Sequence, residues 1–217
     1  FHIFDFSESI AFSACTLNSM ALFSLDIAFS LATFALLEIL SPLMTSKLAA
    51  YLFVTPLRFK TPKNELSLSE RSIKRTIKFK NNKISIYEWG TADKAILLVH
   101  GWAGRATQVA HLAKPLMEAG YKVYSFDAPA HGSSNGKRTH FMEFADLILK
   151  IKDLYPEIES IIGHSMGGTA CVYAITQGFE AKKCVTIGSP ASTLWVLQAF
   201  CEQINVSKKV EKLMKYH

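Results

Sequence analysis

The chain has 217 residues, of which 49% are hydrophobic and 19% charged, and it carries a formal net charge of +6. This composition excludes a disordered chain, and the length is enough for one globular domain. The basic residues are spread over 60–83 and 208–215 with no aromatic stacking platform among them, which argues against a nucleic-acid partner. No GxxxxGK[ST] loop, HExxH pair or metal-ligand spacing of cysteines occurs, so we expect no cofactor and no metal.

The first 55 residues form a distinct segment, rich in Phe, Leu, Ala and Ser, in which no Lys or Arg precedes Lys47. We predict a hydrophobic helical segment over residues 1–55. The chain begins at Phe1, and its apolar stretch lacks the preceding positive charge of a secretory signal. Met20 is a candidate for the native start, in which case residues 1–19 would be non-native.

Residues 20–40 are long enough to span a bilayer, but Asp26 and Glu38 would be costly in lipid. Two interpretations stay open: a membrane span, or an amphipathic or buried helix that packs on the rest of the chain. If the segment spans, the Lys and Arg residues from Lys47 onward would hold the following part in the cytoplasm. We therefore expect a cytoplasmic protein and leave membrane association through residues 20–40 open.

Residues 56–72, with two prolines and a charged stretch, are predicted to be a linker. Beyond it, residues 73–80 and 83–89 each alternate apolar and polar side chains, with Asn81 and Asn82 between them. This pattern predicts an antiparallel hairpin at the edge of a sheet.

The region that follows alternates predicted strands and helices. The strands lie near residues 95, 122, 159 and 183, and the helices near 105–119, 140–154 and 166–178. Such alternation is typical of right-handed crossovers in a parallel sheet. The sequence therefore predicts an α/β fold, a mostly parallel sheet flanked by helices.

The continuous apolar run Ala95–Val99 is typical of a buried parallel strand, and it ends in His100, Gly101 and Trp102. Backbone amides after such a strand can face a reacting carbonyl group. In acyl transfer the developing oxyanion needs two N–H donors, one of them from an early loop of this kind. Trp102 is the candidate donor here.

A second turn, Asp127–Ser134, closes the predicted strand 122–126, and its residues fit a loop at the carboxyl edge of a sheet. Asp127 is interpreted as a residue that orders this loop. His131 and His140 lie in or after the same loop, where we expect an exposed histidine without a special role.

A third motif has the GxSxG pattern that can form a nucleophile elbow, because it follows an apolar pair and precedes a stretch of small residues. Its residues are Gly163, His164, Ser165, Met166 and Gly167. A sharp strand-to-helix bend would expose the Ser165 hydroxyl for attack on a carbonyl carbon, and the amide of Met166 would be the second oxyanion donor.

These three motifs, in this order, resemble the α/β-hydrolase family over residues 73–190. The resemblance implies a mostly parallel sheet wrapped by helices, a triad of serine, acid and histidine, and a mobile cap, of which residues 191–217 would be the start. Many members carry glycine where Ala130 stands, and we expect this departure to alter the loop locally. His100 and His164 are interpreted as structural, since each lies inside a turn motif.

The acid and the histidine of the triad stay unassigned. In this fold they follow the serine, but after Ser165 the sequence has no aspartate and only one histidine, the terminal His217. The downstream carboxylates are Glu180, Glu202 and Glu211, none at a predicted strand end. We therefore expect a truncated hydrolase, a fragment or an interrupted reading frame, that lacks about 60 residues.

We predict a serine hydrolase that cleaves an ester or related acyl bond of a small molecule. Ser165 would attack, and the amides of Trp102 and Met166 would hold the oxyanion. The alternative is a catalytically incomplete fragment or a non-catalytic remnant of the fold. The substrate stays open, because the same elbow serves thioesterases, lipases, peptidases and acyltransferases.

Overall fold

The computed structural model describes residues 33–216. The chain divides into two compact units, of which the larger is Ala49–Gln198. The smaller unit combines parts of Phe1–Leu48 and Ala199–His217, of which residues 33–48 and 199–216 are described. The domain boundaries expected from the sequence remain a prediction.

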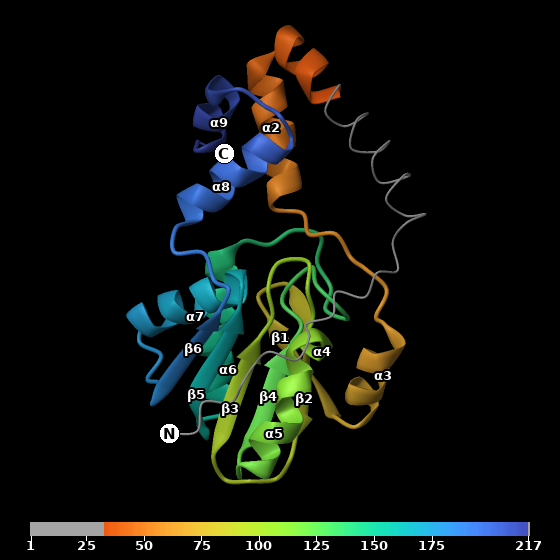
Figure 1. Cartoon of the computed structure of the whole chain (residues 1–217), viewed down its shortest axis with the longest axis vertical. Helices are drawn as coiled ribbons and strands as arrows, with labels where there is room; N and C mark the ends of the chain where they lie inside the picture. The colour runs from red at the N-terminus through yellow and green to blue at the C-terminus, as the bar shows by residue number, and fades with distance from the viewer. Residues whose placement is uncertain (1–32, 217) are drawn as a thin grey trace. The chain divides into compact units, whose positions relative to one another are not determined.

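The helices and strands follow one another as shown in Figure 1. In chain order they are α2 (Pro42–Phe53), α3 (Lys63–Glu70), β1 (Ile73–Phe79), β2 (Asn82–Trp89), β3 (Ala95–Val99), α4 (Ala106–Val109), the 3₁₀ helix η1 (Ala110–Leu112), α5 (Ala113–Glu118), β4 (Lys122–Phe126), α6 (Phe141–Leu154), β5 (Ile158–His164), α7 (Met166–Thr176), β6 (Lys183–Ile187), α8 (Thr193–Gln203) and α9 (Lys208–Met214). Residues 33–40 are also helical.

The strands form one mixed sheet in the order β1-β2-β4-β3-β5-β6. Strands β4, β3, β5 and β6 are parallel, whereas β1 and β2 form an antiparallel hairpin that pairs with β4. The predicted α/β class and the predicted hairpin are confirmed. Of the two central residues of the hairpin turn, Lys80 has a positive φ of 51° and Asn81 does not, which is the sign pattern of a type II′ turn.

Helices cover both faces of the sheet (Figure 1). Buried side chains of α6 and α7 pack on one face, and those of α4, η1 and α5 on the other. Helix α3, which lies within the stretch expected to be a linker, contributes Leu68 to the second face. The helix predicted over 105–119 is divided into α4, η1 and α5, since Pro115 cannot donate to the carbonyl four residues earlier and its ring crowds that group.

A central and an edge strand of the parallel part differ in burial. All five residues of β3 are buried, as expected for a strand between two neighbours, while all five residues of the edge strand β6 are exposed. Val185 and Ile187 keep 47% and 40% of their surface in solvent. The end of β5 that leads into α7 therefore lies close to an open sheet edge.

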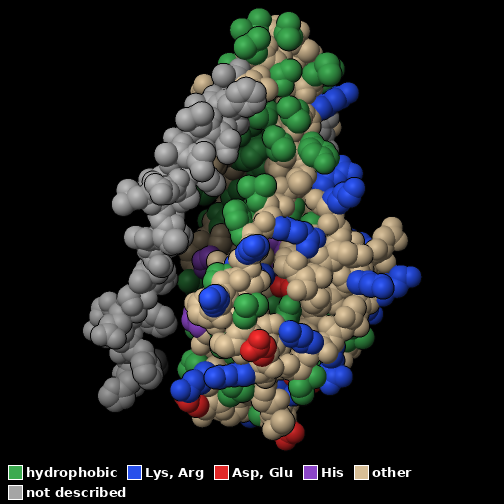
Figure 2. Space-filling model, turned by 90° about the vertical axis from the view of Figure 1, so that its right-hand side faces the viewer, with side chains coloured by type: hydrophobic (Ala, Val, Ile, Leu, Met, Phe, Trp, Pro, Cys, Tyr) green, Lys and Arg blue, Asp and Glu red, His purple; other side chains and the backbone are tan. Residues whose placement is uncertain are grey.

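The smaller unit has its own buried residues, Phe34, Cys201, Val210 and Met214. Ser207 caps the start of α9, and its own N–H donates to Glu38 Oε2 at 3.1 Å. Exposed apolar side chains of 33–48 are prominent in Figure 2, whereas Lys and Arg side chains lie scattered over the larger unit.

Among the described residues, no helix combines the length and the apolar character that a membrane span requires. Most of the segment 20–40 lies outside those residues, so its membrane association stays a prediction.

Candidate active site

Ser165 occupies the bend between β5 and α7 with φ 51° and ψ −129°. A residue with a side chain rarely adopts this conformation, which costs on the order of 1–3 kcal/mol and persists only where the surroundings impose it. The backbone N–H of Ser165 donates to the carbonyl of Ile187 on β6 at 2.8 Å. The bend is therefore tied to the neighbouring strand, and its serine is half-buried.

Glycines let the bend approach the turn after β3. A Cβ added to Gly163 would lie 2.5 Å from Gly168 Cα, and one added to Gly167 would collide with the carbonyl oxygen of His100. A Cβ added to Gly101 would lie 2.9 Å from Ser165 Cβ. The structure thus brings the turn that starts at His100–Trp102 into backbone contact with the bend at Gly163–Gly168.

Two main-chain donors at this contact are free. Within residues 33–216, neither the N–H of Trp102 nor that of Met166 makes a hydrogen bond to the protein. Trp102 directly follows Gly101, which touches Ser165, and Met166 directly follows Ser165. Two such donors beside a hydroxyl are what a developing oxyanion needs, because each can donate to an oxygen that gains charge.

His100 is a structural residue. Its side chain is fully buried, Nε2 accepts from the N–H of Ala128 at 3.1 Å, and Nδ1 donates to the carbonyl of Gly101 at 2.7 Å. Burial lowers the pKa of His100 to about 4, so the ring is neutral near pH 7. Both ring nitrogens of His100 are hydrogen-bonded to backbone groups, so neither is available as a base.

The sequence interpretation of His131 as an exposed histidine is wrong. The residue is 1% exposed, and its ring packs against Trp102, His100 and Phe144. Its Nε2 accepts from the N–H of Ala103 at 3.0 Å, and Nδ1 donates to the carbonyl of Pro129 at 2.9 Å. The error arose because a loop at a strand end is expected to face solvent, whereas helix α6 covers this one.

The remaining described histidines do not reach Ser165 either. His140 is exposed and caps α6 by accepting from Glu143 N–H, and His111 is exposed beside the carbonyl of Gln108. His164 is exposed at the end of β5. No hydrogen bond joins Ser165 to any histidine or carboxylate of the described chain. The base and the acid thus stay unassigned here, as they were in the sequence.

Of the downstream carboxylates, only Glu180 belongs to the unit that contains Ser165, and it is exposed. Glu211 is buried in the smaller unit and forms ion pairs with Lys208 and Lys215. Glu202, in the same unit, is exposed. In residues 33–216 no group of His, Cys, Asp or Glu side chains is arranged to hold a metal ion.

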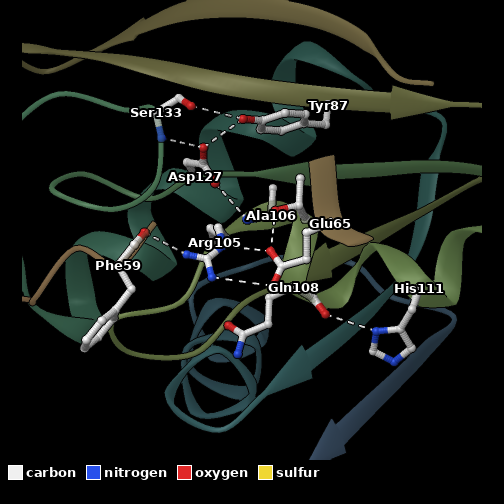
Figure 3. A network of polar contacts seen from close by, with 10 residues as sticks. Phe59, Glu65, Tyr87, Arg105, Ala106, Gln108, His111, Asp127 and Ser133 are labelled. Carbon is white, nitrogen blue, oxygen red and sulfur yellow. Dashed lines mark hydrogen bonds and ion pairs between the residues drawn. The ribbon is translucent and has the colours of Figure 1, made fainter. Parts of the chain in front are cut away.

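Asp127 connects three segments, as Figure 3 shows. Its Oδ1 accepts from the N–H of Ala106 at 2.7 Å, and its Oδ2 accepts from the N–H of Ser133 at 2.8 Å and from the hydroxyl of Tyr87 at 3.0 Å. Burial raises the pKa of Asp127, against the opposing effect of these donors, and raises that of Tyr87 to about 12. The carboxylate orders loops, as the sequence predicted.

Two arginines that the sequence analysis missed hold the neighbouring loops. Arg105 donates through Nε to Glu65 of α3 at 2.7 Å and through a second nitrogen to the carbonyl of Phe59 at 3.0 Å (Figure 3). Arg58 donates to the carbonyls of Gly132 and Ser134, both at 2.7 Å. Their partners lie 40 to 76 residues away along the chain, so no local pattern marks them.

Ala130, the departure from the family pattern, adopts φ 65°. Glycine reaches this left-handed region without steric cost, whereas an alanine pays about 1–2 kcal/mol. The N–H of Ala130 donates to the carbonyl of Asn135 at 2.9 Å, which closes the loop in spite of the side chain. The substitution therefore leaves the fold of the loop intact.

Comparisons with known proteins place the chain in a family. The family model described as serine aminopeptidase, S33 matches residues 90–215, which is more than half of the chain. A monoacylglycerol lipase of Mycolicibacterium smegmatis is 33% identical over 95 residues, or 38% of this chain and 34% of that protein. A monoglyceride lipase homolog of Monkeypox virus is 30% identical over 93 residues, or 39% of this chain and 34% of that protein. The match thus spans about a third of the length of each relative.

Solved structures show the same fold. An esterase from Pyrococcus furiosus matches with a TM-score of 0.56 and 25% identity over 75% of this chain and 65% of that one. An esterase from Exiguobacterium antarcticum matches with a TM-score of 0.52 and 19% identity over 60% of this chain and 55% of that one. The chain therefore belongs to the serine aminopeptidase S33 family of α/β-hydrolases.

Proposed function

We propose that this chain carries the nucleophile and the oxyanion-binding donors of a serine hydrolase that cleaves an ester or related acyl bond. The observation that carries the proposal is the bend at Ser165, whose strained backbone lies beside the two free N–H groups of Trp102 and Met166. An ordinary serine at a helix start would have extended backbone and would use its hydroxyl as a cap, and Ser165 does neither.

In the proposed reaction the Ser165 hydroxyl loses its proton to a base, and Oγ bonds to the carbonyl carbon of the substrate. The carbonyl oxygen becomes an oxyanion and accepts from Trp102 and Met166. The alcohol then leaves with a proton as the carbonyl re-forms, and water hydrolyses the acyl group from Ser165. The proposal assigns no residue as the base or as the acid that orients it.

The names of the relatives support a substrate class. Two of them are named as lipases for monoacylglycerol or monoglyceride, and two solved neighbours are esterases. We therefore propose a small carboxylic ester as the substrate and would test monoacylglycerols beside short esters of p-nitrophenol.

A fluorophosphonate probe tests the nucleophile on the full chain, with and without added imidazole as an external base. We expect one phosphonylated residue, located by peptide mass spectrometry at Ser165, and faster labelling with imidazole. Ser165→Ala should abolish labelling, and Ser133→Ala, at an exposed serine of the same unit, should not. Equal labelling of wild type and Ser165→Ala would contradict the proposal.

A non-catalytic role for the chain is the second candidate. It is favoured by one observation, that no described histidine forms a hydrogen bond with Ser165. Without a base the serine is a weak nucleophile. Absence of labelling in both the presence and the absence of imidazole, in a chain shown to be folded by circular dichroism, would support this candidate.

Cytoplasmic location and membrane association through residues 20–40 remain predictions. Partition of the expressed chain between membrane and supernatant fractions would test them. A chain that stays with membranes in high salt would support a span, and one released by salt would contradict it.

A further inference from the structure

The turn formed by residues 101–104 has three backbone N–H groups that could face the reacting carbonyl, and two of them are occupied. The N–H of Gly104 donates to the carbonyl of Gly101 at 3.1 Å, and that of Ala103 donates to His131 Nε2 at 3.0 Å. Of the N–H groups of Trp102, Ala103 and Gly104, only that of Trp102 remains without a protein acceptor in the described chain. Which N–H group is free to donate to an oxyanion therefore depends on the hydrogen bonds of the whole turn.

Ala103 shows why this choice needs support. Its φ is 54° while that of Trp102 is not positive, the sign pattern of a type II turn. Type I and type II turns differ by a rotation of the central peptide unit, here the one that joins Trp102 to Ala103. An alanine at the third position disfavours the type II form relative to glycine. Some other contact must hold this peptide unit in place.

The contact that does so is the acceptor on His131. Its ring cannot move easily, because it lies between Trp102 at 5.3 Å, His100 at 5.0 Å and Phe144 at 5.2 Å between ring centroids. Nδ1 is bonded to the carbonyl of Pro129, which orients Nε2 toward Ala103. Burial and the neighbouring His100 lower the pKa of His131 to about 3, so Nε2 carries a free lone pair at neutral pH.

The segment that carries His131 is held in turn from outside. Arg58 donates to the carbonyls of Gly132 and Ser134, and Asp127 accepts from the N–H of Ser133. These bonds flank His131 on its C-terminal side and leave the loop little freedom. The imidazole of His131 is thus a rigid acceptor that belongs to the loop after β4 and accepts from the turn after β3.

We propose that His131 is a positioning residue: by accepting from the Ala103 N–H it fixes the turn of residues 101–104, and with it the position of the adjacent Trp102 N–H that would donate to the oxyanion. The inference rests on the proposed function for its catalytic consequence but not for the contact itself. His131 does not act as the base, because both of its nitrogens are occupied by backbone groups and its ring is buried.

Three variants of the full chain test the inference. His131→Leu keeps an apolar side chain of similar size in the cage but removes the acceptor. His131→Gln restores an acceptor at about the distance of Nε2 from the backbone. His140→Leu is the matched control, since it removes an exposed histidine at the end of the same loop without touching the turn.

The first readout is hydrogen exchange of the Ala103 amide, measured by NMR, which needs no catalysis. We expect His131→Leu to accelerate this exchange about tenfold, the effect of losing one hydrogen bond. His131→Gln and His140→Leu should stay within about threefold of wild type. Unchanged protection of Ala103 in a folded His131→Leu variant would overturn the inference.

The second readout is the rate of Ser165 labelling by the fluorophosphonate with imidazole present. Without the acceptor on His131 the turn, and with it the Trp102 donor, is displaced from its place beside Ser165, which predicts a labelling rate lower by roughly 10- to 100-fold in His131→Leu, with recovery in His131→Gln. A merely structural role would lower the melting temperatures of His131→Leu and His131→Gln without a difference between their labelling rates. A labelling rate equal to wild type in His131→Leu would overturn the inference. If wild type itself does not label, the proposed function fails, and exchange alone decides whether His131 holds the turn.

Discussion

The turn after β3 and the bend after β5 meet beside Ser165, but different forces hold them. On the β3 side, buried polar side chains bond to the main chain. His100 binds Ala128, His131 binds Ala103, and the Asp127 carboxylate binds Ala106. All three side chains are at most 1% exposed. This half of the site is built from hydrogen bonds in a low-dielectric interior, where each unmade bond is costly.

On the β5 side, apart from the main-chain hydrogen bond from Ser165 to Ile187, the bend is held by close packing. In the described chain no side-chain hydrogen bond involves residues 163–168. Glycines bring backbone against backbone there, and the hydroxyl of Ser189 is buried next to Gly168 with no partner. We therefore expect substitutions that remove polar atoms to lower the stability of the β3 side, and substitutions that add carbon atoms to lower the stability of the β5 side.

The largest effect is expected for Gly167→Ala. Alanine in a helix is normally better than glycine by about 1 kcal/mol. At this position the new Cβ would collide with the carbonyl oxygens of Val99 and His100, which are backbone atoms and cannot turn away. We expect a loss of at least about 3 kcal/mol in the free energy of unfolding, measured in urea.

Gly120→Ala is the control for that variant. Gly120 has φ 84°, so alanine is strained there too, but nothing lies within 4 Å of the added Cβ. We expect a cost of about 1–2 kcal/mol. A loss for Gly167→Ala no larger than that for Gly120→Ala would show that close packing does not hold the bend.

On the β3 side, Asp127→Asn should cost about 2–4 kcal/mol. Both carboxylate oxygens accept hydrogen bonds, so the amide NH₂ of asparagine must face at least one of the donors on Ala106, Ser133 and Tyr87. Urea unfolding would measure the loss. Asp153→Asn, at an exposed aspartate of α6, should change stability by less than about 0.5 kcal/mol, and an equal effect of the two would contradict the network.

Acidification should also weaken the β3 side. Burial lowers the pKa of His100 to about 4 and that of His131 to about 3, while unfolded histidine titrates near 6.5. At pH values between the folded and the unfolded pKa, the unfolded chain binds more protons than the folded chain. The free energy of unfolding therefore falls as the pH falls. From pH 7 to pH 5 each histidine should remove about 2 kcal/mol. Protonation of Asp127, whose pKa is raised, acts in the opposite direction.

Comparison of wild type with His131→Gln separates these contributions. Arg58, His100 and Asp127 face position 131 in both proteins, so their titration largely cancels. The variant should lose about 2 kcal/mol less than wild type between pH 7 and pH 5. Parallel stability curves for the two proteins would mean that folding does not lower the pKa of His131.

The sequence predicted the β5 side better than the β3 side. Glycines flanking Ser165 mark a tight bend directly, and the apolar run Ala95–Val99 marks the central strand, because both signals are local. The burial of His131 and the contacts of Arg58 and Arg105 depend on segments 28 to 76 residues apart. No period or spacing in one sequence carries such contacts. The base and the acid stay unassigned because the sequence after Ser165 contains no aspartate and no histidine other than His217.

The smallest effects come from a pair of buried serines, one on each side. The hydroxyl of Ser134 accepts from Ser85 N–H at 2.9 Å and donates to the carbonyl of Asp127, so Ser134→Ala should cost about 1–2 kcal/mol. The hydroxyl of Ser189 has no partner among the described residues, and Ser189→Ala should leave stability unchanged or raise it by up to about 1 kcal/mol, since an unpaired buried polar atom is removed.

Opposite signs for these two alanine variants, measured by urea unfolding, would sharpen the comparison, because the same atom is deleted from both sides of the site. Ser189→Ala should also label at Ser165 as fast as wild type, since no hydrogen bond joins position 189 to the bend. A destabilisation by Ser189→Ala as large as that by Ser134→Ala would mean that the β5 side, too, depends on a polar contact. The division between hydrogen bonding after β3 and packing after β5 would then be wrong.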